Sequence, residues 1–401
     1  MKRVLFVDDE PMILAGLQNM LRKQRKVWDM AFVESGAKAL EKLAEASFDV
    51  IVSDMRMPRM DGATLLKEVQ RRYPNVVRIV LSGHAELDTA LRSVSVAHQF
   101  LAKPCDASSL ENLVDRACSL QALLGDDKIR TAIGTIGQLP SAPEIYIALT
   151  KALEDPDTSM KDLAHLIERD MAISAKVLQL VNSAFFGLPQ RVASVQQALS
   201  YLGANMIRRV LLSVETFSMF EKEKVAGPFS LEALQAHSNV VAAVASKLMD
   251  DAVRSGDAFM AGMLHDVGKL ILAVYVPDHF KRAMALGMER NVPLHVAEQE
   301  LFGVTHAEIG GYLLGIWGLP YAIVEAVAHH HSPGRVEHAT FDVLDAVYVA
   351  EALVSEASKR AEAPSAPSHL DSAYIEVFGL ESKLPAWREM VSEVMSSMGA
   401  G

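Results

Sequence analysis

Three carboxylates follow short apolar runs near the start of the sequence. Asp8 and Asp9 come directly after Val4–Val7, and Asp54 comes two residues after Ile51-Val52. Such runs predict buried strands, and the carboxyl ends of neighbouring strands in an open parallel sheet form a ligand crevice. Carboxylates packed together raise one another's pKa unless a cation lies between them, and their hard oxygens suit Mg²⁺. We therefore expect these three side chains to converge on a magnesium site.

Two further polar residues end strand-like runs in the same part of the chain. Ser82 follows Val80-Leu81, and Lys103 follows Phe100-Leu101-Ala102. A hydroxyl and an ammonium group beside a carboxylate and Mg²⁺ are what a transferred phosphoryl group needs, because stabilising its oxygens is most of the catalysis. The strand ends therefore predict phosphoryl chemistry.

Histidines form a second candidate site later in the chain. The expected members are His237 on one helix, His265 and Asp266 adjacent on another, His306 at a third helix start, and His330 in a run of three histidines. Neutral imidazoles and a bridging carboxylate drawn from several helices could hold two ions of iron, manganese or zinc. Such a pair would activate water for phosphodiester hydrolysis, with Lys269 near a phosphate oxygen.

Adjacent residues on a helix point about 100° apart, so His265 and Asp266 could share a metal only at the shoulder between them. Three interpretations stay open: a catalytic metal site, a metal site without catalysis, and a buried polar network that fixes the helices or senses a ligand. Gly262 and Gly268, expected in one helix, each cost about 1 kcal/mol relative to Ala and therefore indicate close helix packing.

The elements that must position these residues differ between the two parts of the chain. Five short runs rich in β-branched or aromatic residues alternate with helical patterns such as Pro11–Arg22 and Gly62–Arg72: Lys2–Val7, Met30–Val33, Val50–Ser53, Val77–Leu81 and Gln99–Leu101. This alternation predicts a five-stranded, doubly wound parallel sheet. From Asp106 onward we expect no strand, and segments such as Ser159–Leu180, Leu231–Met249 and Ala307–Leu314 predict an all-α part.

The predicted fold class is therefore α/β followed by all-α. The expected boundaries are an α/β domain over 1–122, a helical linker over 123–135, an all-α domain over 136–360, a Pro- and Ala-rich linker over 361–370, and a helical tail over 371–401. The tail contains an amphipathic stripe of Trp387, Met390, Val391, Val394 and Met395.

Charge is unevenly distributed along the 401 residues. Residues 1–122 hold 17 Lys and Arg against 16 Asp and Glu, a net charge of +1, so the second part carries a net charge of -12 within the overall -11. An acidic body of this kind is a poor binder of DNA or anionic membranes. No apolar stretch predicts a signal peptide or a membrane span, and two cysteines cannot form a disulfide framework. We expect a cytoplasmic protein that does not bind DNA directly.

The first part resembles a response-regulator receiver domain, a flavodoxin-like fold. The matching motifs are Asp8-Asp9, the run Asp54–Gly62, Ser82-Gly83 and Phe100-Leu101-Ala102-Lys103-Pro104. The resemblance implies that Asp54 accepts a phosphoryl group from a sensor histidine kinase, and that Asp8, Asp9 and the backbone carbonyl of Arg56 hold Mg²⁺. Ser82 and Lys103 would contact the phosphoryl oxygens, Phe100 would be the switching aromatic, and the Lys103–Pro104 bond is often cis in the family.

The second part is similar to the HDOD domain, an all-helical relative of HD hydrolases, over roughly 130–355. The motifs are Leu139-Pro140-Ser141-Ala142-Pro143, Asp155-Pro156, Val181–Phe186 and Ala198–Gly203, with Asp170-Met171 where the family commonly has Asp-Pro. HD hydrolases place a late metal-binding Asp where this chain has Glu351, and the Gly-Tyr-Pro triplet of the cyclic di-GMP phosphodiesterases is absent. The resemblance implies a signalling output through an unidentified downstream protein. The alternative is a phosphorylation-regulated phosphodiesterase acting on a cyclic nucleotide.

A 3,4-spaced apolar stripe crosses the joint between the two parts and consists of Leu110, Leu113, Ala117, Leu120 and Leu124. Part of it must close the last receiver helix onto its own sheet. Because the stripe spans only two heptads, pairing of two chains into a homodimer remains open.

Overall fold

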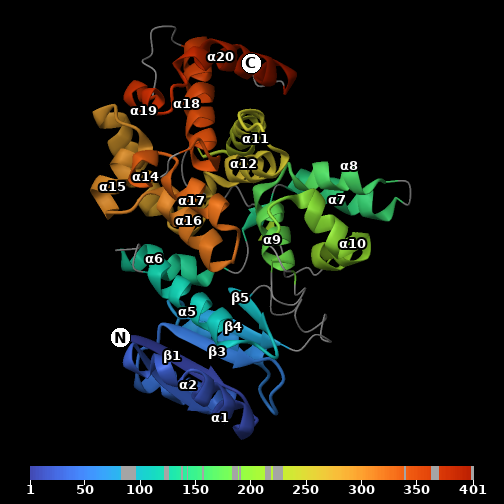
Figure 1. The fold of residues 1–401 in the computed structure, drawn as a ribbon, viewed down its shortest axis with the longest axis vertical. Helices are drawn as coiled ribbons and strands as arrows, with labels where there is room; N and C mark the ends of the chain where they lie inside the picture. Colours follow the sequence, from blue (N-terminus) through green and yellow to red (C-terminus); the bar gives the residue numbers. More distant parts are fainter. Residues whose placement is uncertain are drawn as a thin grey trace.

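The computed structural model describes most of the chain. It covers residues 1–398 except 83–95, 122–125, 137–138, 142, 156–157, 183–187, 189–190, 213–217, 220–228, 338–339 and 363–369. Figure 1 shows an α/β part at the N-terminal end and a larger helical part that carries the C-terminus.

A parallel sheet of five strands forms the α/β part, in the order β2-β1-β3-β4-β5. The strands are β1 (Lys2–Val7), β2 (Trp28–Val33), β3 (Val50–Asp54), β4 (Val77–Ser82) and β5 (Gln99–Ala102). Val4 pairs with both Met30 and Val50, so β1 lies in the interior of the sheet. All five predicted strands are present, and the doubly wound sheet is confirmed.

Helices cover both faces of this sheet, because alternate strand residues point to opposite faces. The described helices are α1 (Pro11–Met20), the 3₁₀ helix η1 (Arg22–Lys26), α2 (Gly36–Glu45), α3 (Gly62–Arg72) and α5 (Ala107–Gln121). Side chains of α1 and α5 share one core with Phe6 and Val52. Those of α2 and α3 share another with Leu5 and Ile51, and this second core continues into the helical part.

The helical part begins with α6 (Asp127–Thr135). There follow α7 (Pro143–Glu154), α8 (Met160–Ile167), α9 (Met171–Val181), α10 (Val195–Leu212), α11 (Leu231–Lys247), α12 (Ala252–Leu264), α13 (Val267–Tyr275), α14 (Pro277–Arg290), α15 (Leu294–Phe302), α16 (His306–Ile316), α17 (Tyr321–His329), η4 (Pro333–Arg335), α18 (Val343–Glu362), α19 (Ser372–Val377), η5 (Glu381–Lys383) and α20 (Leu384–Ser397). The all-α prediction is confirmed apart from one short strand pair, β6 (Pro140–Ser141) with β7 (Ser218–Met219), which has too few residues to show a pattern.

Two helix predictions are wrong in detail. The segment Ser159–Leu180 is two helices, because the Asp170 side chain accepts hydrogen bonds from the backbone N–H groups of Ala172 and Ile173 and so starts α9. His265 and Asp266 do not lie within one helix, since α12 ends at Leu264 and α13 begins at Val267.

The two glycines consequently belong to different helices, but both mark close packing. A Cβ atom at Gly262 would lie 2.7 Å from Ala242 Cα, and one at Gly268 would lie 1.9 Å from the His306 carbonyl oxygen.

The C-terminal tail packs on the helical part. Val391, Val394 and Met395 of α20 are buried, as the amphipathic stripe predicts, and α20 contacts α11 and α18. Among the described residues, the stretch Ala252–Tyr275 is long and apolar enough to cross a membrane. It is 78% buried and is divided between α12 and α13, which is typical of core helices.

Candidate functional site

The receiver crevice lies where β1 and β3 end. The two strands are neighbours with Val7 paired to Ser53, so the next residues, Asp8 and Asp54, share one edge of the sheet. Asp8 is only 1% exposed, and Asp9 follows it with partial exposure. The Lys103 ammonium lies between the two carboxylates, with its Nζ 2.7 Å from Asp8 Oδ2 and in contact with Asp54 Oδ1.

Backbone groups fix the carboxylates further. The Arg56 N–H donates to Asp54 Oδ2 at 2.6 Å, and the Glu10 N–H donates to Asp8 Oδ1 at 3.0 Å. Burial disfavours the charged form of Lys103, but its bonds to Asp54 and Asp8 outweigh this effect and raise its pKa. The crevice therefore holds a fixed positive charge beside the carboxylate of Asp54.

The other predicted receiver residues lie on β4 and β5. Ser82 ends β4 and pairs with Ala102, but its side chain is outside the described part. Phe100 is buried in β5, and the Lys103–Pro104 peptide is cis, as the resemblance implies. The oxygen donors at this edge suit Mg²⁺ chemically. Lys103 lies beside Asp8 and Asp54, a placement that suits contact with a phosphoryl group on Asp54.

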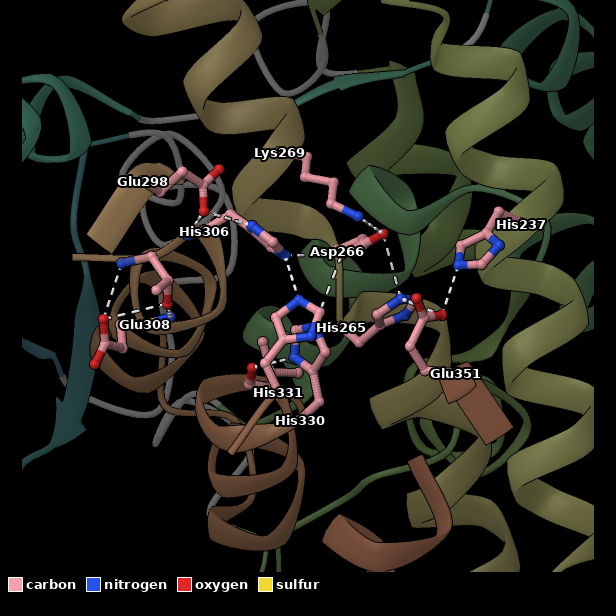
Figure 2. Close-up of polar contacts among 12 residues, drawn as sticks. His237, His265, Asp266, Lys269, Glu298, His306, Glu308, His330, His331 and Glu351 are labelled. Atoms are coloured by element: carbon pink, nitrogen blue, oxygen red, sulfur yellow. Dashed lines mark hydrogen bonds and ion pairs between the residues drawn. The ribbon is translucent and has the colours of Figure 1, made fainter. Parts of the chain in front are cut away.

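The histidines form two neighbouring groups, each with ligand atoms within 4.8 Å of one another (Figure 2). We name the first the Asp266 group: Asp266, His306, His330 and His331. We name the second the His237 group: His237, His265 and Glu351. Every predicted residue of the second site is thus brought together, and His331 is an additional member that the run of three histidines could have indicated.

Helix ends position most of these side chains. Asp266 directly precedes α13, and His265 directly follows α12. His306 is the first residue of α16, which starts with a capping box in which Thr305 and Glu308 bond to each other's backbone N–H. His330 and His331 directly follow α17. Because these side chains stand at the ends of different helices, they can all point toward one centre between the helices.

Asp266 bridges the two groups. Its Oδ1 lies 3.3 Å from His306 Nε2 and 3.8 Å from His330 Nε2, whereas its Oδ2 lies 3.3 Å from His265 Nε2. The backbone is only slightly distorted between α12 and α13, since His265 keeps helical angles (φ -55°, ψ -36°) and Asp266 has φ -98° and ψ 10°. One carboxylate therefore offers an oxygen to each group, as in a two-metal site.

Glu351 completes the His237 group. Its Oε2 lies 2.7 Å from His237 Nε2 and 3.5 Å from His265 Nε2, and Ser355 donates to its Oε1 at 3.2 Å. The glutamate thus reaches the position expected of a ligand from α18.

Outer partners orient the imidazoles. His265 Nδ1 donates to the Gly262 carbonyl at 2.7 Å, and His330 Nδ1 donates to the Val327 carbonyl at 2.8 Å. His306 Nδ1 donates to Glu298 Oε2 at 2.7 Å. These bonds aim each Nε2 at the centre of the cluster, which is the arrangement found around protein-bound metals.

Glu298 was not predicted, because it lies eight residues before His306 on a different helix, and we identify no sequence signal for it.

Several buried polar atoms at the centre make no hydrogen bond within the described chain: His265 Nε2, His330 Nε2 and Asp266 Oδ1. Buried polar atoms are normally satisfied, so these orphaned lone-pair atoms fit a metal ion. Burial holds the pKa of His330 and of His331 well below the ordinary value, which keeps both imidazoles neutral and able to ligate. Burial also opposes the charged form of His265, but the carboxylates of Asp266 and Glu351 raise its pKa to about 10, so a metal ion at this nitrogen would have to displace a proton. The donor set of nitrogen and carboxylate ligands suits iron, manganese or zinc.

A cavity of about 1080 Å³ opens beside the cluster. Lys269, His306, His331 and Glu351 line one side, and Lys269 Nζ lies 2.6 Å from Asp266 Oδ2. The lining also includes Tyr348 and two residues of the C-terminal tail, Asp371 and Tyr374. The Asp371 N–H donates to the Tyr348 hydroxyl at 2.8 Å, and Tyr374 donates to Asp345. The cavity is large enough for a small-molecule ligand.

Comparisons with known proteins agree with both halves. A model of the response regulator receiver domain matches residues 4–115, and a model of the HDOD domain matches residues 139–333. An uncharacterized protein of Treponema pallidum is 27% identical over 208 residues, covering 49% of this chain and 38% of that protein. The DNA-binding transcriptional regulator NtrC of Escherichia coli is 42% identical over 87 residues, covering 21% of this chain and 19% of the regulator. The chain thus spans less than half the length of these relatives.

Solved structures are similar as well. The MmoQ response regulator from Methylococcus capsulatus is 23% identical with a TM-score of 0.48, and the match covers 63% of this chain and 98% of that one. The receiver domain of an HD domain-containing protein from Pseudomonas fluorescens is 29% identical with a TM-score of 0.29, covering 30% of this chain and 89% of that one. The two family matches, together with the sheet and the helical body, identify the chain as a two-component response regulator with an N-terminal receiver domain and a C-terminal HDOD output domain.

Proposed function

We propose that Asp54 accepts a phosphoryl group from a sensor histidine kinase and that this event controls the HDOD domain. Asp8, Asp9 and the Arg56 carbonyl would hold Mg²⁺, which neutralises charge on the phosphoryl oxygens when bound. Lys103 and Ser82 would bind the phosphoryl group, and Phe100 would respond to it. The observation that carries this proposal is the Lys103 ammonium placed between Asp8 and Asp54.

Labelling with acetyl phosphate tests this assignment. Asp54→Asn should abolish Mg²⁺-dependent labelling, because an amide cannot accept the group. Asp61→Asn is a matched control, since Asp61 caps α3 through the Thr64 N–H and asparagine also caps helices well. Labelling of Asp54→Asn at the wild-type level would show that the acceptor is misassigned.

For the output, we propose that the HDOD domain binds a downstream signalling protein and that its histidine cluster holds metal. We place the chain in the cytoplasm, and because its second part is strongly acidic we propose no direct contact with DNA or with a membrane. Metal analysis of the purified chain should find iron, manganese or zinc, and Asp266→Ala should remove it. A metal-free wild type that also fails to take up zinc would contradict the metal assignment.

A second candidate function is a metal-dependent phosphodiesterase gated by the receiver. The cavity beside the bridging Asp266, with Lys269 in its wall, favours it. We nevertheless expect little or no turnover of cyclic di-GMP, because Glu351 extends about one methylene farther into the site than an aspartate would. Robust hydrolysis that is lost in Asp266→Ala, with the fold intact by circular dichroism, would establish the second candidate instead.

A further inference from the structure

We propose that the helical hairpin α16–α17 transmits the state of the receiver to the metal cluster, so that phosphorylation of Asp54 and metal binding by the Asp266 group are energetically linked. The inference rests on the proposed metal binding and adds its regulation. The observation behind it is that one end of this hairpin contacts the receiver while the other end carries three of the four members of the Asp266 group.

The receiver holds the turn between α16 and α17. Arg116 of α5 donates to the Leu319 carbonyl at 3.0 Å, and Gln99 of β5 reaches the Gly315 carbonyl at 3.5 Å. Arg191, from the HDOD domain itself, donates to the Gly318 carbonyl. Carbonyl groups at a helix C-terminus lack partners within the helix and attract cations, which explains why two arginines meet at this turn.

The other end of the hairpin lies at the metal cluster. α16 begins with His306, and α17 is followed by His330 and His331. An α-helix rises about 1.5 Å per residue, so the 11 residues of α16 place His306 roughly 15 Å from the turn that the receiver contacts. Figure 1 shows α16 and α17 in the part of the helical body that faces the receiver, near α5 and α6, and α16 contacts α5.

Glycines make this hairpin rigid and bind it to α13. A Cβ atom at Gly311 of α16 would lie 2.6 Å from Ala328 Cβ of α17. A Cβ atom at Gly310 would lie 2.9 Å from a Val267 methyl, and one at Gly268 would overlap the His306 backbone. The three helices therefore touch backbone to backbone, and a displacement at the turn cannot be absorbed by bending side chains. Asp266, which directly precedes α13, moves with them.

The His237 group lies on other helices. His237 belongs to α11, His265 follows α12 and Glu351 belongs to α18. The chain passes from one set of helices to the other between His265 and Asp266, which is the centre of the cluster. A shift of the hairpin would therefore change how the bridging carboxylate meets the His237 group.

The phosphorylation site connects to the same turn through β5. Lys103, which binds Asp8 and Asp54, lies four residues after Gln99, which contacts Gly315. Phe100 lies between them and is buried in the core that joins the receiver to the HDOD domain. A phosphoryl group on Asp54 gives Lys103 a new partner, and the resulting displacement of β5 and α5 acts on the Gln99 and Arg116 contacts.

Thermodynamic linkage supplies the test, because coupling between two sites must be reciprocal. Zinc affinity of the full chain is measured by chelator competition in saturating Mg²⁺, with and without beryllofluoride, a mimic of the phosphoryl group on Asp54. We expect beryllofluoride to change zinc affinity by at least about fivefold, and zinc to change beryllofluoride affinity by the same factor. Equal zinc affinity in both states would overturn the inference.

Arg116→Gln should bring this factor close to one, because it removes the contact to Leu319. Arg254→Gln is the control, since Arg254 lies at the exposed start of α12, in an ion pair with Asp251, and should leave the factor unchanged. A factor that survives in Arg116→Gln would show that the coupling does not pass through this contact.

Hydrogen exchange separates failure of the inference from failure of metal binding. If the wild type binds no zinc in either state, the proposed metal function is wrong. Exchange of the α16 and α17 amides, compared with and without beryllofluoride, then decides the coupling. A change there that is lost in Arg116→Gln supports transmission through the hairpin, and unchanged exchange overturns it.

Discussion

Lys176 is a buried lysine that lies against Trp317, the residue directly after α16, and replacing it should stabilise the protein. It lies in α9, is only 1% exposed, and its Nζ is 5.4 Å from the centre of the Trp317 ring. Burial lowers the pKa of Lys176 from 10.5 to about 7. We therefore predict that Lys176→Met, which keeps a long flexible side chain without the charge, raises the free energy of unfolding at pH 7.

The expected size follows from the pKa. Each tenfold change in an equilibrium constant is about 1.4 kcal/mol, so the fall from 10.5 to about 7 corresponds to roughly 5 kcal/mol of unfavourable free energy at low pH. The contact with the Trp317 ring, which the substitution removes, offsets roughly 0.5–2 kcal/mol. The substitution also removes the other interactions of Lys176 and requires repacking around methionine, which together cost about 1–2 kcal/mol, so we expect a net gain of about 2–3 kcal/mol.

The pH dependence has a definite sign. Between about pH 7 and pH 10 the unfolded chain holds a proton on Lys176 that the folded chain has lost, so this residue makes stability rise with pH by about 1.4 kcal/mol per pH unit. The advantage of Lys176→Met over the wild type should therefore be largest at or below pH 7 and shrink toward pH 10.

Urea unfolding of the helical domain at pH 7, 8 and 9 measures this difference. Lys247→Met, at an exposed position near the end of α11, is the control for loss of a lysine charge, and its difference from the wild type should be small. A Lys176→Met protein that is less stable than the wild type at pH 7, or whose advantage does not vary with pH, would refute the reasoning.

Three further changes test other parts of the structure. Gly268→Ala should destabilise the fold by several kcal/mol in urea unfolding and weaken zinc binding, because its Cβ would overlap the His306 carbonyl, whereas Gly16→Ala, in open space on α1, should be stabilising by about 1 kcal/mol. Glu298→Gln should weaken zinc affinity at least about tenfold in chelator competition, because it alters the partner of His306 Nδ1. Leu120→Glu should shift the chain toward the monomer in light scattering, and unchanged mass with and without acetyl phosphate would contradict a homodimer.

The receiver could be predicted closely because its information is local. Strand runs such as Val50–Val52 are short, apolar and bounded by polar residues, and Gly62–Arg72 has both a helical period and a capping Asp61. The order of β-strands and helices then determines which strand ends meet. The apolar stripe on α5 is a case that local information does not decide. Leu110 and Ala117 are buried in the receiver's own core, as expected if the stripe closes the last receiver helix onto its sheet. Pairing of two chains through Leu120 stays a prediction.

The sequence predicts most of the residues that form the histidine cluster, but it does not predict how their side chains are arranged. Histidines stand out by type, so His237 and the His265-Asp266 pair are recognisable without knowing their distances, whereas Glu351 is indicated only by the resemblance to HD hydrolases. Glu298 was not predicted, because a glutamate on the exposed-looking pattern of α15 resembles any surface carboxylate, and only the tertiary fold places it against His306 with no exposed surface.

The sequence does not predict that α12 ends at Leu264 and that a new helix, α13, begins at Val267. Neither Gly nor Pro stands at His265-Asp266, and the apolar pattern runs through from Met263 to Leu270. A continuous helix would point these two side chains about 100° apart and let one metal bind at most at their shoulder. In the structure one Asp266 oxygen faces His265 and the other faces His306. His265 keeps helical backbone angles, so Asp266 joins two ligand groups carried by different helices through the two oxygens of its carboxylate rather than through a sharp break in the backbone.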